Sequence, residues 1–408
     1  MKKTISDIKI SGRRVLLRVD FNVPIRDGVI SDDTRLKAAI PTIDYAVSNG
    51  ARVILCSHLG RPLKEEKKAK ERGLPFDRER FSLRPVASHL EKLLSRNVDF
   101  LDSCRGPEVF RFVSEMSDGD VCLLENLRFE AGEESNDTSF SEELAQLCDV
   151  YVNDAFGAAH RAHASTAGIA EFATRRVSGL LMERELKFLG RLLDSPEKPY
   201  VAILGGAKVS DKIPIINSLI EKGVDRILVG GAMAYTFLKA NGYTVGKSLV
   251  EDDMLEQALE IQRSASEHGV ELVLPTDHQV VDSYDPLNSR KTIPIDFTNA
   301  GLVGLDIGIE TVALFKEKLV GAKTILWNGP MGMFEEKPFD AGTIEVAKAV
   351  AEATALGAVS IVGGGDSVAA VNETGLQGSI SHISTGGGAA LEFLSGKKLP
   401  GVDALEDK

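Results

Sequence analysis

The sequence predicts a mixed α/β protein whose parallel sheets are divided between two halves of the chain. Short apolar runs without clean polar alternation recur at intervals that leave room for a helix between them, which is typical of strands covered on both faces. A stretch with helical periodicity lies midway along the chain, where Met182, Leu186, Leu189 and Leu193 recur at i, i+4, i+7 and i+11. We therefore expect two domains joined by a helix over residues 179–194, rather than by a flexible tether.

The expected strands follow one another along the chain. In the first half they are VLLRV (15–19), RVILCS (52–57), DVCLLEN (120–126) and DVYVND (149–154). In the second half they are YVAILGG (200–206), RILVGG (226–231), VELVLP (270–275), TILWNG (324–329) and VSIVGGG (359–365). The charged stretch 62–80 fits neither pattern, and we expect a solvated loop or a short exposed helix there.

The composition of the sequence argues against several classes of protein. A net charge of −12 over 408 residues argues against broad, sequence-independent nucleic-acid binding, which needs a basic surface. The sequence has no apolar run long enough to cross a bilayer and no secretory signal near its N-terminus. None of the four cysteines forms a CxxC pair, so buried free thiols in a reducing cytoplasm are the expected state of Cys56, Cys104, Cys122 and Cys148.

Polar and charged residues follow the strands of the first half. Ligands of open parallel sheets bind beyond the carboxyl ends of the strands, and guanidinium groups match carboxylate and phosphate oxygens. Several arginine side chains that converge at the carboxyl ends of these strands predict a site for a small, multiply charged anion. Taken singly, each arginine could be a surface residue, and Asp20 and Asn22 could cap the turn before Pro24. The residues concerned are Asp20, Asn22, Arg35, His58, Arg61, Arg128, His160, Arg161 and His163.

Glycines follow the strands of the second half at five places, in GGAK, GGAM, NGPMG, GGGDS and STGGGA. Glycine lets backbone N–H groups approach phosphate closely, and a following helix N-terminus favours an anion. One glycine pair usually marks only a turn, but five such strand ends predict nucleotide or polyphosphate binding. Asp366 follows three glycines and is placed to hold Mg²⁺.

Lys208 and Lys212 follow the first glycine pair with i, i+4 spacing. If a helix begins near Lys208, both ammonium groups lie on one face near its N-terminus, with a phosphate chain between them. A pair of solvated lysines is the alternative.

Two nucleotide motifs are not satisfied. The stretch GYTVGKS (242–248) has one residue too few between its glycines for a P-loop and follows a helix-like stretch rather than a strand. The sequence also lacks a GxGxxG that opens a βαβ unit with an acidic partner, which disfavours a dinucleotide dehydrogenase.

The motifs RVDFNVP, SHLGRP, LLENLRF, NDAFGAAHRAHAS, ILGGAKVSDKI, LWNGPMGMFE, GGGDS and STGGGA occur in this order. From about residue 5 to its end, the chain closely resembles the phosphoglycerate kinase family. The resemblance implies two Rossmann-like three-layer domains with parallel sheets joined by a hinge helix. It places a phosphoglycerate-binding domain at 1–178, the hinge helix at 179–194 and a nucleotide-binding domain at 195–392, with the segment 393–408 packing back on the first domain.

The resemblance also implies roles for individual residues. Residues that match substrate contacts are Asp20, Asn22, Arg35, His58, Arg61, Arg128 and Arg161. Residues that match nucleotide contacts are Lys208, Lys212, Gly230, Gly231, Asn328, Glu335, Gly363, Gly364, Gly365, Asp366 and Ser367. Asp366 matches the metal ligand, and Arg35, Lys212, Gly365 and Gly387 are the expected catalytic residues.

The implied reaction is reversible phosphoryl transfer between 1,3-bisphosphoglycerate and MgADP, giving 3-phosphoglycerate and MgATP. Because the nucleophile is an anion in either direction, no general base is required. Catalysis then depends on alignment and charge neutralisation after hinge closure. A cytoplasmic monomer without nucleic-acid or membrane partners is expected. Two alternatives remain at this point: a nucleotide-binding regulator with an inactive site, and another sugar-phosphate enzyme that uses no nucleotide, such as an isomerase.

Overall fold

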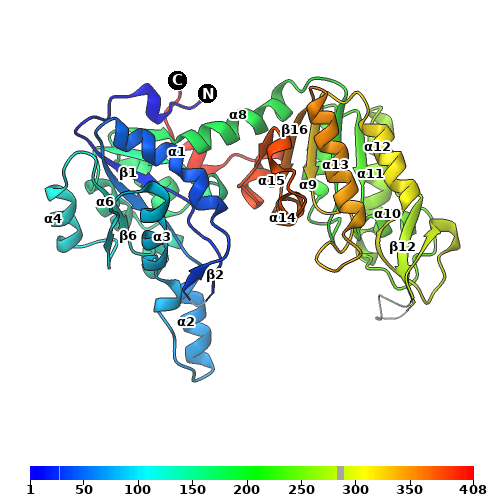
Figure 1. The fold of residues 1–408 in the computed structure, drawn as a ribbon, viewed down its shortest axis with the longest axis horizontal. Coiled ribbons are helices and arrows are strands. Elements are labelled where there is room, and N and C mark those ends of the chain that lie inside the picture. The colour runs from blue at the N-terminus through cyan, green and yellow to red at the C-terminus, as the bar shows by residue number, and fades with distance from the viewer. Residues whose placement is uncertain (27, 283–288) are drawn as a thin grey trace. The chain divides into compact units, whose positions relative to one another are not determined.

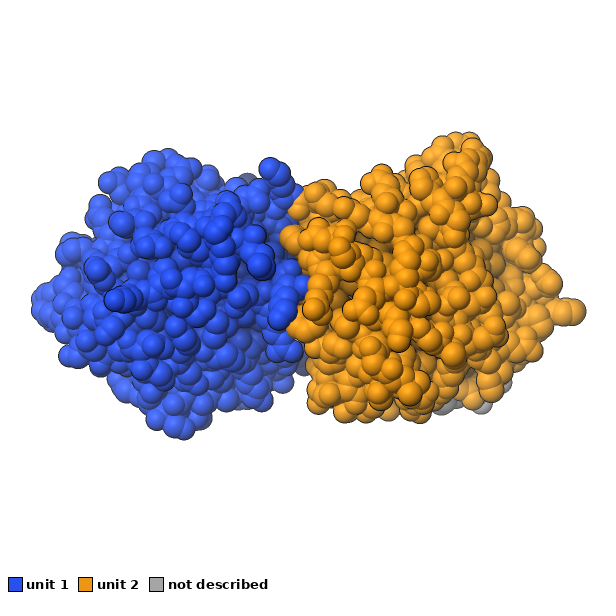
Figure 2. Space-filling view, turned by 90° about the horizontal axis from the view of Figure 1, so that it is seen from above, with its two compact units in different colours: residues 1–187, 398–408 blue, residues 188–397 orange. Residues whose placement is uncertain are grey.

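The computed structural model describes all residues except 27 and 283–288. The chain forms two compact units, unit 1 being Met1–Lys187 with Lys398–Lys408 and unit 2 being Phe188–Lys397 (Figure 2). Each unit contains a six-stranded sheet in which every described pairing is parallel. The α/β class predicted from the sequence is therefore confirmed.

The sheet of unit 1 has its first strand near the centre. In spatial order its strands are β5 (Asp99–Leu101), β6 (Val121–Leu124), β4 (Arg52–Cys56), β1 (Arg14–Arg18), β7 (Val150–Asn153) and β8 (Arg176–Ser178). Val15 and Leu17 of β1 pack into the hydrophobic core on one face of the sheet, and Leu16 packs into the core on the other. Burial on both faces explains why the strand sequences do not alternate between apolar and polar residues.

Helices cover both faces of this sheet (Figure 1). Side chains of α1 (Thr34–Ser48) and α3 (Arg84–Leu94) belong to one core, and those of α4 (Pro107–Glu115), α6 (Thr138–Gln146) and α7 (Ile169–Phe172) belong to the other. The unit also contains the short helices α5 (Ala131–Glu134) and α16 (Pro400–Asp403).

The charged stretch after Arg61 begins as a helix, α2 (Pro62–Glu71), in which only Pro62 is buried. Pro62 lies in the first turn, where its missing N–H costs no hydrogen bond. The second of the two expected conformations, a short exposed helix, is therefore the correct one for this part of 62–80.

The sheet of unit 2 also has its first strand near the centre, but its strand order differs from that of unit 1. Its strands in spatial order are β11 (Glu271–Val273), β10 (Arg226–Val229), β9 (Tyr200–Leu204), β15 (Thr324–Asn328), β16 (Val359–Gly363) and β17 (His382–Ile383). Side chains of α12 (Ile309–Leu319), α13 (Ala341–Ala355) and α14 (Gly365–Glu373) form a core against it. The other helices are α9 (Ile213–Glu221), α10 (Met233–Ala240), α11 (Leu255–Glu267) and α15 (Gly388–Leu394).

Two smaller β structures were not expected from the sequence. Unit 2 carries an antiparallel sheet in the order β13 (Lys291–Pro294), β12 (Asp277–Val281) and β14 (Val303–Ile307), and unit 1 carries the hairpin β2 (Ile25–Arg26) and β3 (Val29–Ile30). Their strands are short and partly exposed, so they lack the continuous apolar runs that identified the central strands.

The helix predicted midway along the chain is α8 (Leu180–Asp194). Near the other end of the chain, residues 398–408 belong to unit 1, where Lys3 N donates to Glu406 O at 2.8 Å and Asn153 Nδ2 donates to Gly401 O at 3.0 Å.

In the described part of the chain, no helix is both long and apolar enough to cross a membrane. All four cysteines are free thiols; Cys148 is half-buried and the other three are buried.

Candidate functional site

Each sheet has a point at which the chain connections run in opposite directions. In unit 1 the chain leaves β1 toward β4 but leaves β7 toward β8, and in unit 2 it leaves β9 toward β10 but leaves β15 toward β16. Crevices at such switch points, beyond the carboxyl ends of the strands, are where open α/β sheets bind ligands. The expected site residues follow these strands in both units.

The loop after β1 holds Asp20, Asn22 and Arg35 together. Arg35 Nη1 donates to Asp20 Oδ1 at 3.2 Å and to the Asn22 carbonyl oxygen at 3.0 Å. Asn22 Oδ1 in turn accepts from Gly60 N at 2.9 Å, which joins this loop to the segment after β4. Strand β1 ends at Arg18, so Asp20 and Asn22 lie in the turn that follows it, where Asn22 N donates to Asp20 Oδ1 at 3.3 Å.

Arg18 is a member of this site that sequence reasoning did not select. It is completely buried at the end of β1, and its Nη2 donates to His58 Nδ1 at 3.0 Å. Its Nε donates to Ser165 Oγ at 2.8 Å, and Ser165 Oγ donates to the buried Glu133 at 2.6 Å. Arginine can only donate, so the proton of the neutral His58 ring lies on Nε2. An arginine inside an otherwise apolar strand was the signal that could have identified it.

The cationic side chains of unit 1 lie close enough to depress one another's pKa values. Burial lowers the pKa of His58 well below its ordinary value, and Arg18, Arg128 and Arg161 lower it further. Burial, followed by the charges of Arg128 and Arg18, lowers the pKa of His163 to about 4. Such mutual repulsion without an equal number of carboxylates favours the binding of an anion.

The remaining expected residues of unit 1 surround this cluster. Arg128 Nη1 donates to Gly60 O at 2.7 Å, and burial lowers the pKa of its guanidinium to about 10, with Glu134 opposing the shift. Arg161 Nε donates to His160 Nε2 at 3.1 Å. Arg61 is exposed at the N-terminal cap of α2, directly after Gly60. The structure thus brings the seven expected substrate residues to one end of the sheet of unit 1.

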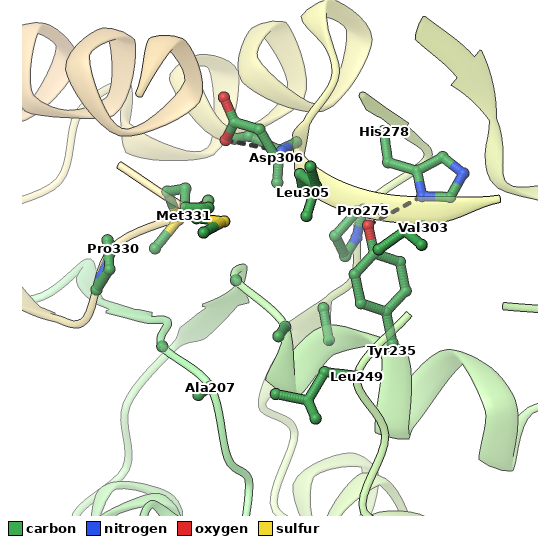
Figure 3. A pocket seen from close by; sticks show the side chains of 18 of the residues that line it. Ala207, Tyr235, Leu249, Pro275, His278, Val303, Leu305, Asp306, Pro330 and Met331 are labelled. Carbon is green, nitrogen blue, oxygen red and sulfur yellow. Dashed lines mark hydrogen bonds between the residues drawn. The ribbon is translucent and has the colours of Figure 1, made fainter. Parts of the chain in front are cut away.

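Unit 2 contains a cavity of about 330 Å³ beyond the ends of β9, β10 and β15. Three expected nucleotide residues, Gly231, Glu335 and Asp366, contribute to its lining. Figure 3 shows Met331 and Pro330 on one side of the cavity and Tyr235 and Leu249 on the other. An apolar cavity with a few polar groups at its edge is suited to a flat, partly apolar ligand. The lining residues that sequence reasoning missed include Tyr235, Leu249, His278, Val303, Asp306 and Met331.

Lys212 lies at the edge of the second crevice. Its Nζ donates to Asn328 Oδ1, and Asn328 Nδ2 donates to Gly363 O at 2.7 Å, which joins the segments after β9, β15 and β16. Burial lowers the pKa of Lys212, while the charges of Asp211 and Asp366 oppose that shift. Ser367 Oγ accepts from Gly329 N at 2.5 Å, so this hydroxyl holds the backbone of the crevice.

The glycines after these strands serve two different purposes. A Cβ at Gly231 would lie 2.5 Å from Gly206 N, and one at Gly230 would lie 2.5 Å from Met331 Sδ, so these glycines allow loops to pack closely. By contrast, a Cβ at Gly365 or Gly387 would meet no atom within 4 Å. Gly365 and Gly387 therefore leave space over the backbone that a ligand could fill, whereas Gly230 and Gly231 shape the loops, and Gly231 also lines the cavity.

Lys208 is not in a helix, so the conditional prediction of a helix from that residue is wrong. Helix α9 begins at Ile213, with Lys212 as its N-terminal cap and Pro214 in its first turn. A helix beginning at Lys208 would place Pro214 in its interior, where the ring removes a hydrogen bond and clashes with the preceding turn. Lys208 lies exposed in the loop before it.

The donor set in unit 2 fits a magnesium ion that arrives with a phosphate ligand. Asp366 lies in the first turn of α14 beside the cavity. The described residues contain no cluster of three or more His, Cys, Asp or Glu side chains that could hold a metal by themselves. Mg²⁺ is commonly bound by one or two carboxylates, with phosphate oxygens and water completing its shell.

Comparison with known proteins gives one consistent result. The sequence profile described as phosphoglycerate kinase matches residues 5–397. A phosphoglycerate kinase of Clostridium perfringens is 53% identical over 409 residues, covering 100% of this chain and 99% of that protein. One from Thermosipho africanus is also 53% identical, covering 100% and 98%.

Solved structures agree with the sequence comparisons. The phosphoglycerate kinase of Coxiella burnetii superposes with a TM-score of 0.87 at 41% identity, covering 99% of this chain and 98% of that one. The structure from Pyrococcus horikoshii gives a TM-score of 0.83 at 33% identity, with the same coverage.

Proposed function

The chain belongs to the phosphoglycerate kinase family and has that family's activity, phosphoryl transfer with a carboxyl group as acceptor; from this premise we propose how its own residues carry the reaction. Unit 1 binds 3-phosphoglycerate or 1,3-bisphosphoglycerate, and unit 2 binds ATP or ADP together with Mg²⁺. The observation that supports this division most strongly is the contrast between a buried cationic cluster around His58 and an apolar, glycine-edged cavity beside Asp366.

In unit 1 the acidic substrate is held by Asp20, Asn22, Arg35, His58, Arg61, Arg128 and Arg161. The arginines neutralise its phosphate and carboxylate oxygens, for which their planar, charged donors are suited. Asp20 accepts from a substrate hydroxyl while it also orients Arg35. His58 presents Nε2–H to the ligand, because Arg18 occupies its other nitrogen.

In unit 2 the base and ribose enter the cavity, with Glu335 contacting the ribose and Gly230, Gly231 and Asn328 forming the wall. The phosphates extend toward Lys208, Lys212 and the N-terminus of α14, where a helix dipole and free N–H groups favour anions. These backbone donors come from Gly363, Gly364, Gly365, Asp366 and Ser367. Asp366 holds Mg²⁺, which when bound neutralises charge on the phosphate oxygens.

In the direction of ATP use, a carboxylate oxygen of 3-phosphoglycerate attacks the γ-phosphorus, and the bond to the ADP oxygen breaks. The nucleophile is already an anion, so no proton has to be removed. His278 lines the cavity, but both of its ring nitrogens are engaged in hydrogen bonds, which supports a mechanism without a general base. Arg35 and Lys212 neutralise the transferring group, together with N–H groups of Gly365 and Gly387.

The two substrates bind to different units, so the reaction requires closure about α8. Closure also excludes water, which would otherwise hydrolyse the acyl phosphate. We expect the 1–178 and 195–392 domains to move as rigid bodies on the hinge at 179–194. Of the expected segment 393–408, residues 398–408 belong to unit 1 and would move with the first domain. A cytoplasmic monomer is the proposed working state.

A coupled assay tests this function. Purified protein is mixed with 3-phosphoglycerate and MgATP, and ADP formation is followed, with each substrate omitted in turn. The proposal requires ADP formation that depends on both substrates and ceases when Mg²⁺ is chelated. Turnover of the sugar acid without nucleotide would instead support the isomerase alternative.

A further inference from the structure

Three buried polar side chains, none of them among the expected site residues, form a hydrogen-bonded chain beside the cavity of unit 2. Tyr235 lies on α10, His278 on β12 and Thr298 directly after the short 3₁₀ helix Ile295–Phe297. Their exposed fractions are 6%, 1% and 6%. His278 Nδ1 lies 2.9 Å from Tyr235 Oη, and His278 Nε2 lies 2.8 Å from Thr298 Oγ1.

The direction of each hydrogen bond among these three side chains follows from Thr298. Thr298 Oγ1 lies 2.7 Å from the Ile295 carbonyl oxygen, which can only accept, so the threonine hydroxyl donates there. Thr298 Oγ1 therefore accepts from His278 Nε2–H, which leaves His278 Nδ1 to accept from the Tyr235 hydroxyl. This assignment requires a neutral ring, and burial lowers the pKa of His278 to about 4 although Asp277 opposes the shift.

The local backbone is shaped around this contact. A Cβ at Gly304 of β14 would lie 1.8 Å from Tyr235 Oη and 2.9 Å from His278 Nδ1. Any side chain at that position would displace the tyrosine hydroxyl from the histidine.

These hydrogen bonds join two walls of the cavity that come from different parts of unit 2. Tyr235 belongs to the wall that follows Gly231 after β10, whereas His278 and Val303 belong to the antiparallel sheet. Figure 3 shows the Tyr235 hydroxyl directed at the His278 ring, with Val303 beside them.

Hydrophobic packing alone would have held α10 against the antiparallel sheet without the cost of desolvating polar groups. Leu238, Val245 and Ile295 already form an apolar cluster with Tyr235. Burying three polar groups beside it has a desolvation cost, which is offset by their mutual hydrogen bonds and by the one from Thr298 to the Ile295 carbonyl oxygen. Hydrogen bonds are directional, so unlike apolar packing they fix the orientation and the separation of the two walls.

We infer that Tyr235, His278 and Thr298 are positioning residues that set the width of the nucleotide cavity and thereby the affinity for the nucleotide. The inference rests on the proposed assignment of this cavity to ATP and ADP. It assigns no chemical step to His278, whose two nitrogens are occupied within the protein.

A double-mutant cycle with Tyr235→Phe and His278→Leu tests the inference. Each single variant leaves a buried polar partner unpaired, so we expect the KM for MgATP and the Kd for MgADP to rise about tenfold. The kcat and the KM for 3-phosphoglycerate should stay within about twofold, because the site in unit 1 is untouched. Tyr243→Phe, which removes the hydroxyl of an exposed tyrosine, is the matched control and should change none of these values.

The double variant separates positioning from a purely structural role. It removes both partners of the Tyr235–His278 hydrogen bond, so its Tm should recover toward that of the unaltered protein. Its nucleotide KM should stay raised, because the two walls are no longer joined.

Three results have distinct meanings. A nucleotide KM within twofold of the starting value in every variant overturns the inference, as does a KM that recovers together with Tm in the double variant. Failure of the unaltered protein to bind MgADP would instead reject the proposed function. If His278→Leu alone does not fold, Tyr235→Phe and the double variant still decide the question.

Discussion

Lys212 is half-buried and bonds Asn328 at the end of β15, which in turn bonds Gly363 at the end of β16. Because its pKa is lowered by burial, its ammonium group is incompletely compensated until a phosphate arrives. We predict that Lys212→Ala lowers kcat about 100- to 1,000-fold while changing either KM much less, since the charge matters most for the transferring group. Steady-state kinetics measure this split, with Lys222→Ala at the other end of α9 as the control. A rise in the KM for ATP without loss of kcat would show that Lys212 serves binding only.

Asp366 is the carboxylate proposed to hold Mg²⁺. We predict that Asp366→Asn raises the Mg²⁺ concentration needed for half-maximal activity about tenfold, because an amide oxygen is a weaker ligand than a carboxylate. Magnesium titrations at saturating nucleotide measure the shift. Glu373→Gln, at the opposite end of α14, should leave the titration unchanged; an unshifted curve for Asp366→Asn would place the ion elsewhere.

His163 makes folding stability depend on pH. Its pKa is about 4 in the folded protein and 6.5 without the fold, so the unfolded chain binds more protons as pH falls below 6.5. Stability is therefore lost as pH falls through the window from 6.5 to about 4. We predict that His163→Gln removes about 2 kcal/mol of the decrease in unfolding free energy between pH 7.5 and 5.

Urea unfolding at the two pH values gives this difference directly. The exposed His268 provides the control, since His268→Gln should leave the pH dependence as it was. Equal pH dependence in His163→Gln and the unaltered protein would show that other groups cause the acid sensitivity.

At the level of elements, the glycine loops of unit 2 depend on close backbone packing. Gly231 has φ of +65°, and a Cβ there would meet Gly206 N at 2.5 Å and Pro330 O at 2.9 Å. We predict that Gly231→Ala lowers the unfolding free energy by about 2 kcal/mol more than Gly269→Ala does. Gly269 has a similar φ of +71° in open space, so the comparison removes the cost of the backbone conformation. Similar losses in both variants would mean that packing contributes nothing.

The central strands were predictable because burial on both faces leaves a continuous apolar run, as Val15, Leu16 and Leu17 illustrate. The antiparallel sheet was not predictable, because β13 is largely exposed and β12 contains polar residues. His278 and Val303, which line the cavity of unit 2, come from that sheet. This wall of the cavity proposed to bind the nucleotide was therefore not predictable, whereas the glycine segments beside it were.

That polar residues gather at one end of the sheet of unit 1 was predictable, because they follow the carboxyl ends of its strands. Arg18 was missed because strand position alone does not reveal that it bonds His58 and Ser165 rather than solvent. The lysine spacing left open whether a helix begins near Lys208, whereas Pro214 in the first turn is consistent with the start of α9 at Ile213. In each case, long-range contacts or backbone sterics decided the outcome.

At the scale of the whole molecule, the account requires two sites on separate compact units to meet during the reaction. Unit 1 and unit 2 have their own sheets and cores, and α8 begins in one and ends in the other. A helix can transmit a rigid-body rotation, with the conformational change confined to a few residues at its ends. In the proposed assignment each ligand binds a single unit, so neither ligand alone should stabilise the closed state.

Small-angle X-ray scattering in four ligand states tests this claim most directly: without ligand, with 3-phosphoglycerate, with MgADP, and with both. The pair of 3-phosphoglycerate and MgADP cannot react, so the ternary state is stable during measurement. The account predicts a smaller radius of gyration only when both ligands are present. Equal radii in all four states would contradict it.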